Sequence, residues 1–206
     1  MTSDLHHLPP RFAAALGSLR SPRLRPGVRL VEIPGPSRIA PYTVALEGAA
    51  TNPYSDSDEP DDATGRFVVL FDPDEQPGWQ GDFRVVTMVR TTLDAEVAAD
   101  PMLDEVGWSW VTGAFNRAGL DAVALGGTVT RVLSTKFGAL TGDNASWGDA
   151  LGPESVDVEV RASWTPATTD LGAHLQLWMD VLGTSAGMDS LPEGVTALAS
   201  RRVALR

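Results

Sequence analysis

The sequence predicts an α+β fold, in which a mainly antiparallel sheet is packed by two longer helices and a short N-terminal helix. Three observations lead to this class. The expected strands are grouped along the chain and do not alternate with helices, as is typical of α+β proteins. Residues 156–164 alternate between apolar and polar side chains, the pattern of a strand with one buried and one wet face. Residues 101–118 and 171–186 instead place apolar residues at helical spacing.

The N-terminal third is expected to hold little regular structure, because nine of the 15 prolines lie in its first 60 residues. A short amphipathic helix is predicted at 10–20, after Pro9-Pro10, and short strands at 28–33 and 42–46. An acidic loop is predicted at 47–64. It contains five acids within seven positions, which repel one another and stay solvated: Asp56, Asp58, Glu59, Asp61 and Asp62.

A hairpin is predicted in the middle of the chain. Residues 66–71 form a continuous apolar run and 83–93 a long strand, joined by turn-forming residues 72–81 that carry Trp79. The second strand has apolar residues on both faces, which indicates a central strand covered at least partly on each side.

The first of the two longer helices follows a helical turn at 94–99. Asp100 is a good N-cap residue and Pro101 suits a first helical turn, so we predict a helix over 101–118, ended by Gly119.

The last third should contain two more strands and a helix. A strand is predicted at 128–134, preceded by Gly126-Gly127, which indicates a bulge, and a loop at 138–154 holds Trp147. The strand at 156–164 should share a sheet with 83–93. Asp170 is expected to cap the final helix, and Gly187 to end it. The apolar stripe of that helix consists of Leu171, Leu175, Trp178 and Leu182.

Length and composition limit the class of protein. We expect the 206 residues to form a single domain, 1–206, with a Pro-rich, Arg-bearing N-terminal segment at 1–41. The absence of cysteine excludes disulfides, thiol nucleophiles and Cys-based metal sites. The longest stretch free of Asp, Glu, Lys and Arg has eleven residues, 106–116, whereas a membrane span needs about 18. No secretory signal is visible at the N-terminus, so a cytoplasmic location is predicted.

The net charge of −11 disfavours direct binding to nucleic acid or to anionic lipid. The charge is uneven, since residues 1–40 carry six arginines against Asp4 and Glu32. The expected partner is therefore a protein and not a membrane.

No motif for a nucleophile, phosphate loop or zinc protease is present, so no catalytic residue, metal or cofactor is predicted. His174 lies beside the stripe of the last helix, where it is either a general base or, more simply, a satisfied boundary histidine. Arg84 and Arg90 share a strand face. They either form an anion platform with Arg66, Arg131 and Arg161 or pair singly with nearby acids.

The tryptophans offer a second set of candidates. Trp79 and Trp147 lie in predicted loops, where an indole either contacts a partner or folds back over the core. Trp108 and Trp110 face opposite sides of their helix, so at most one of them reaches any single cleft.

Several strings of the sequence resemble an uncharacterised actinobacterial family catalogued as domain of unknown function number three thousand. They include Asp100-Pro-Met-Leu-x-Glu-Val-Gly-Trp-Ser-Trp110, Arg161-Ala-Ser-Trp-Thr-Pro166 and Asp170-Leu-Gly-Ala-His-Leu175. The resemblance spans residues 10–198. It implies a bacterial, cytosolic protein without an assigned activity, with an RNA-processing factor as a candidate partner, and it transfers no catalytic residue.

Two hypotheses of function remain open. The first is an accessory or interaction domain without a catalytic site, suggested by the missing chemical motifs and the uneven charge. The alternative is a small-molecule-binding protein or enzyme with a pocket between the sheet and helix 101–118. The binding residues predicted for these functions are Trp79, Arg84, Arg90, Trp108 and His174.

Overall fold

The structure, a computed structural model, describes residues 8–54, 61–98, 100–142, 146–152 and 155–188. Its elements follow one another as α1 (Pro10–Leu19), β1 (Val28–Ile33), β2 (Tyr42–Ala50), β3 (Ala63–Phe71), β4 (Phe83–Asp94), α2 (Ala95–Ala98), α3 (Leu103–Ala118), β5 (Ala122–Leu133), β6 (Lys136–Phe137), the 3₁₀ helix η2 (Gly138–Thr141), β7 (Ala150–Leu151), β8 (Ser155–Pro166) and α4 (Leu171–Ser185). The α+β class predicted from the sequence is confirmed. Within the described residues, no helix is long and apolar enough to cross a membrane.

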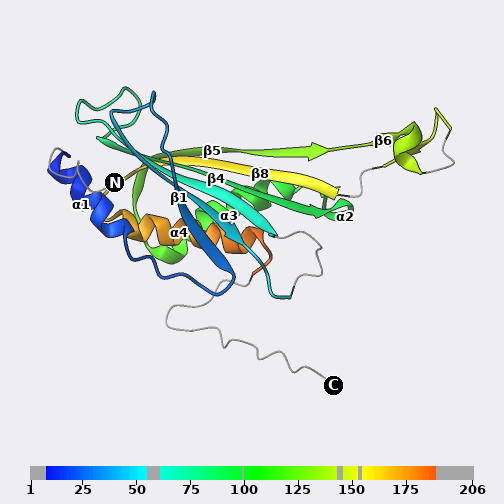
Figure 1. Ribbon diagram of the computed structural model, residues 1–206, viewed down its shortest axis with the longest axis horizontal. Coiled ribbons are helices and arrows are strands. Elements are labelled where there is room, and N and C mark those ends of the chain that lie inside the picture. The colour runs from blue at the N-terminus through cyan, green and yellow to red at the C-terminus, as the bar shows by residue number, and fades with distance from the viewer. Residues whose placement is uncertain (1–7, 55–60, 99, 143–145, 153–154, 189–206) are drawn as a thin grey trace, which may run out of the picture.

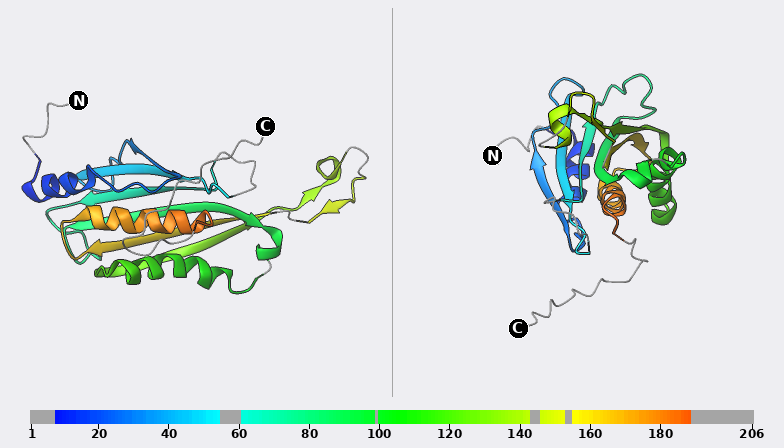
Figure 2. Two further views of the ribbon diagram at one scale, coloured as in Figure 1. Left: turned by 90° about the horizontal axis from the view of Figure 1, so that it is seen from below. Right: turned by 90° about the vertical axis from the view of Figure 1, so that its right-hand side faces the viewer.

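Six strands form one antiparallel sheet in the order β1-β2-β3-β4-β8-β5 (Figure 1). The predicted pairing of the two clearest strands is confirmed, since Val89 of β4 lies opposite Val160 of β8. β6 and β7 form a separate two-stranded ribbon, which projects beyond the end of the main sheet (Figures 1 and 2).

The helices lie on one face of the sheet, and the core lies between. Trp178 of α4 packs against Phe67 of β3 with a ring-centroid distance of 5.8 Å. Phe12 of α1 stacks on Phe71, and α3 lies beside α4 (Figure 2). Apolar side chains that alternate along the strands face these helices, so burial of this one face drives the sheet together.

The other face of the sheet, here the open face, carries no helix among the described residues. It shows Arg84, Val86, Met88 and Arg90 of β4, which are half-buried or exposed. β4 is therefore a central strand, as expected, but only its helix-facing side is covered by a helix.

Several strands are longer than the sequence predicts, β2 and β5 by the most. β2 continues to Ala50, and β3 begins at Ala63, so both ends of the predicted acidic loop 47–64 belong to strands. Residues 55–60 of that loop lie outside the described residues. The prediction stopped early because Gly48 resembles a loop residue. It is instead required in the strand, since a Cβ on Gly48 would approach Trp178 to 2.6 Å. β5 starts six residues earlier than predicted, at Ala122, and the expected bulge shifts its register between Val123 and Gly126.

The start of α3 and the capping of α4 also differ from the sequence prediction. α3 begins at Leu103, because the Asp100 carboxylate accepts a hydrogen bond from the backbone N–H of Met102 and so closes a turn before the helix. Asp170 precedes α4, but its side chain makes no capping hydrogen bond. Ser18 of α1 supplies the cap, because its Oγ accepts hydrogen bonds from the N–H groups of Leu171 at 3.0 Å and Gly172 at 3.1 Å.

Replacing Ser18 by alanine should lower the free energy of unfolding by about 1–2 kcal/mol, because two N–H groups at the start of α4 lose their acceptor. Urea denaturation measures this loss. Ser109→Ala is the matched control, since this exposed hydroxyl bonds only to Val106 O within its own helix, and a change below about 0.5 kcal/mol is expected there. Equal losses in the two variants would refute the capping role of Ser18.

Candidate functional site

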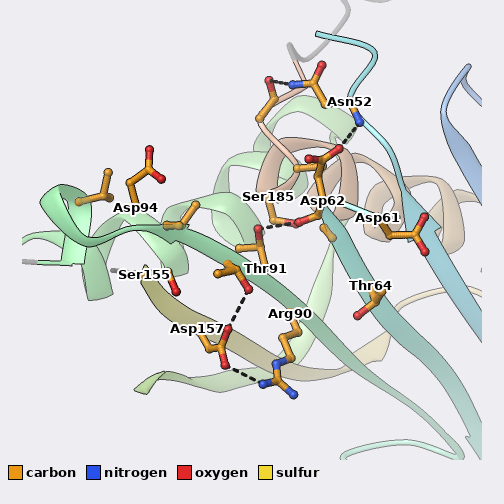
Figure 3. Close-up of a pocket in the computed structure, with 16 residues that line it drawn as sticks. Asn52, Asp61, Asp62, Thr64, Arg90, Thr91, Asp94, Ser155, Asp157 and Ser185 are labelled. Atoms are coloured by element: carbon orange, nitrogen blue, oxygen red, sulfur yellow. Dashed lines mark hydrogen bonds and ion pairs between the residues drawn. The ribbon is translucent and has the colours of Figure 1, made fainter. Parts of the chain in front are cut away.

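A cleft of about 840 Å³ lies at one end of the sheet (Figure 3). The ends of β3, β4, β8 and α4 line it, together with Val97 of α2 and Asn52. Its polar lining is formed by Asn52, Asp61, Asp62, Thr64, Arg90, Thr91, Thr92, Asp94, Ser155, Asp157 and Ser185. This position differs from the pocket predicted between the sheet and helix 101–118.

Three of the four aspartates in the cleft already have a partner within the protein. Asp61 forms an ion pair with Arg29 at 2.8 Å, and Asp157 forms one with Arg90 at 2.8 Å. The Thr92 hydroxyl and then the Arg90 guanidinium donate hydrogen bonds that hold the pKa of Asp157 below its usual value. Asp62 accepts a hydrogen bond from the Asn52 N–H. A polar or cationic small molecule would therefore have to displace existing bonds in order to bind here.

Acidic side chains in the cleft do not gather into a metal site. No group of three or more His, Cys, Asp or Glu side chains suited to a metal ion occurs in the part of the chain that the structure describes.

Of the five binding residues predicted from the sequence, Arg90 lines this cleft and the other four lie elsewhere. The five do not converge on one site.

Arg84 and Trp79 lie near one another at a different place on the open face, linked through Thr165. The Arg84 guanidinium donates to Ser163 Oγ at 2.7 Å and to Thr165 Oγ1 at 3.4 Å, and the Thr165 hydroxyl donates to the carbonyl oxygen of Trp79. Partial burial lowers the pKa of Arg84. The Trp79 side chain is half-buried.

The remaining strand arginines do not form an anion platform with Arg84. Arg66, Arg90 and Arg161 pair with Glu47, Asp157 and Glu159, while Arg131 pairs with Asp104 on the helix-covered side. Of the two alternatives given by the sequence, single pairing with nearby acids therefore describes these four arginines. Only exposed or half-exposed ion pairs result, each of which contributes about 0–1 kcal/mol.

His174 is a core residue with 1% of its surface exposed. Its Nδ1 accepts a hydrogen bond from Trp164 Nε1 at 3.2 Å, and Phe115 lies beside both rings. Burial lowers its pKa to about 4, against a smaller upward effect of Asp170. The imidazole is therefore neutral at pH 7 and protonated on Nε2. Its surroundings are those of a satisfied structural histidine.

Trp108 is half-buried and packs from α3 onto β5. A Cβ on Gly127 would lie 2.6 Å from the indole Cζ3, so glycine is what allows this contact. The residue that precedes Trp108, Gly107, faces both strands, because a Cβ there would lie 3.1 Å from Val129 of β5 and 3.5 Å from Val160 of β8. α3 therefore seats closely on the sheet at this point, where the alternative hypothesis expected a pocket.

The most exposed apolar surface lies on the projecting ribbon, which we call the arm (residues 134–142 and 146–152). Trp147 is 99% exposed, Leu140 75% and Phe137 61%. Of the two predicted loop tryptophans, Trp147 thus stands free of the core. Sequence analysis identified Trp147 but missed Phe137 and Leu140, because their separation in a loop gives no periodic signal.

Comparisons with known proteins identify a family without assigned chemistry. No curated protein and no solved structure matches the chain. A family model described as protein of unknown function (DUF3000) matches residues 8–196, nearly the whole sequence. The chain therefore belongs to the DUF3000 family.

Proposed function

We propose that the chain is a protein-interaction module of the cytoplasm, and that the arm is its contact element. The observation that carries this proposal is the exposure of Trp147, Leu140 and Phe137. All three belong to the arm, which projects from the main sheet (Figure 1). Exposed apolar side chains that gather at one place mark interaction sites, and tryptophan is among the residues that contribute most to binding energy.

The chemistry of the arm favours a protein over other partners. Its described charged residues are Lys136 and Asp149, which cancel, so the arm offers neither a basic patch for phosphate nor an acidic one. The partner that fits is a protein with an apolar pocket wide enough for an indole. The cleft at the end of the sheet supports a ligand-binding function less well, since three of its four aspartates already accept bonds from groups of the protein.

A photoreactive amino acid at position 147, introduced in the organism that makes the chain, tests this proposal. We expect a discrete covalent adduct with a protein, and a several-fold weaker adduct when Leu140→Ser is added. Position 54 is the matched control, because Tyr54 is a 79% exposed aromatic residue away from the arm, and it should give no such adduct. Absence of an adduct at 147, or the same adduct at 54, would refute the proposal.

A further inference from the structure

The two edges of the main sheet differ in how they are protected. β1 is a six-residue edge strand with charged Arg29 and Glu32, flanked by Pro26 and Pro34. Short length, charge and neighbouring proline are the usual devices that prevent another strand from pairing with an edge. β5, at the opposite edge, has twelve residues and no proline or lysine.

The β5 edge is open to solvent. Its backbone pairs with β8 on one side, and within the described residues no other backbone hydrogen bond involves 122–133. Thr128, Thr130 and Val132 are exposed on the open face. The single charge, Arg131, is neutralised by Asp104 at 2.9 Å. Threonine and valine favour strands, so this edge is a template for strand addition.

We propose that β5 pairs antiparallel with β5 of a second copy, about a two-fold axis at Thr130, so that two six-stranded sheets become continuous. The regular part of β5 runs from Gly127 to Leu133, after the bulge, and Thr130 is its centre. Antiparallel pairing of a strand with itself is a closed, self-complementary contact. This pairing of two copies is separate from the arm contact proposed above and does not depend on it.

Side chains on the helix-covered face fit one another in this register. Leu133, which is 52% exposed, falls opposite the partner's Gly127, where the partner's Trp108 lies. Leu133 of one copy would thus contact the Trp108 indole of the other, because Gly127 has no side chain to separate them. Arg131 falls opposite the partner's Val129, so no like charges face each other.

The helices also leave room for the pairing. At Gly107, close to the axis, α3 lies over both Val129 of β5 and Val160 of β8, that is, between the two strands. With strands about 4.8 Å apart, the two α3 helices would be about 10 Å apart, which is within the usual spacing of packed helices. A second copy would thus be received without a clash of backbones.

The mass of the purified chain in solution, measured by light scattering after gel filtration, tests the dimer. At micromolar concentration we expect twice the 21.9 kDa of one chain. Thr130→Lys places two ammonium groups face to face and should raise the dissociation constant at least about tenfold. Thr64→Lys, the same change at an exposed position of the interior strand β3, should leave the dimer intact.

The register is tested by a cysteine. Because the chain has none of its own, Thr130→Cys should give one disulfide-linked dimer under oxidising conditions, and Thr64→Cys should not. A monomeric mass with no disulfide at position 130 would overturn the inference. A dimer that survives Thr130→Lys would also overturn it, as would one that is lost in Trp147→Ser. Since these readouts use purified protein, their failure leaves the cross-linking test of the arm unaffected.

Discussion

Replacing Trp178 by alanine is expected to lower the free energy of unfolding by about 3–5 kcal/mol, the largest single effect that we predict. The side chain is 1% exposed and lies against Phe67. It occupies space that Gly48 and Gly65 leave free on neighbouring strands, where an added Cβ would come within 2.6 and 3.0 Å of the indole. Removal would empty that space, and a backbone bound in a sheet cannot close it.

Chemical denaturation followed by circular dichroism measures this loss, and Trp147→Ala is the control. The two changes delete the same side chain, but the indole of Trp147 is 99% exposed, so its removal should change stability by less than about 0.5 kcal/mol. Similar losses in both variants would contradict the assignment of Trp178 to the core and of Trp147 to the surface.

The second large effect is a loss of stability in acid that arises from His174. Its pKa is about 4 in the folded protein and 6.5 when unperturbed, so the unfolded chain binds the proton more tightly. The stabilising contribution is complete above pH 6.5, falls as the pH drops, and is exhausted near pH 4. The difference amounts to about 3 kcal/mol.

Denaturation between pH 7 and 4 in wild type and His174→Gln isolates this contribution. Glutamine does not titrate, and its amide oxygen can accept the Trp164 N–H, so the variant should lose much less stability over this range. Asp157, whose pKa is lowered, loses its own contribution at more acidic pH, below its ordinary 3.8. Equal acid sensitivity of the two proteins would contradict a neutral, buried His174.

Local patterns in the sequence predicted the elements whose two faces differ. The alternation of Val156–Trp164 identified β8, and the stripe of Leu171, Leu175 and Trp178 identified α4, because burial of one face selects side chains at a fixed period. The extension of β2 through Gly48 was not predicted, because the reason for a glycine there is its contact with Trp178, which lies 130 positions later in the sequence. The capping of α4 by Ser18 was not predicted either, because the two segments are also far apart in the sequence.

The candidate site was harder to predict than the fold. Arg84 and Arg90 do share the open face, as their spacing requires. Their partners Ser163 and Asp157 lie on the neighbouring strand β8, and the spacing of the arginines does not determine the register between the two strands. His174 differs from a solvated histidine only through burial by Trp164 and Phe115. The exposure of the arm depends on where the ribbon leaves the sheet, which no local pattern encodes.

The hydrogen bonds from Leu171 and Gly172 to Ser18 join residues more than 150 positions apart. During synthesis, α1 leaves the ribosome more than 150 residues before its capping partner in α4. β5 likewise waits for β8, the strand with which it pairs. A nascent chain that ends before α4 therefore exposes the apolar face of a sheet that it cannot complete. The fold can therefore close only after α4 has left the ribosome, and until then the apolar face of the earlier strands is available to chaperones.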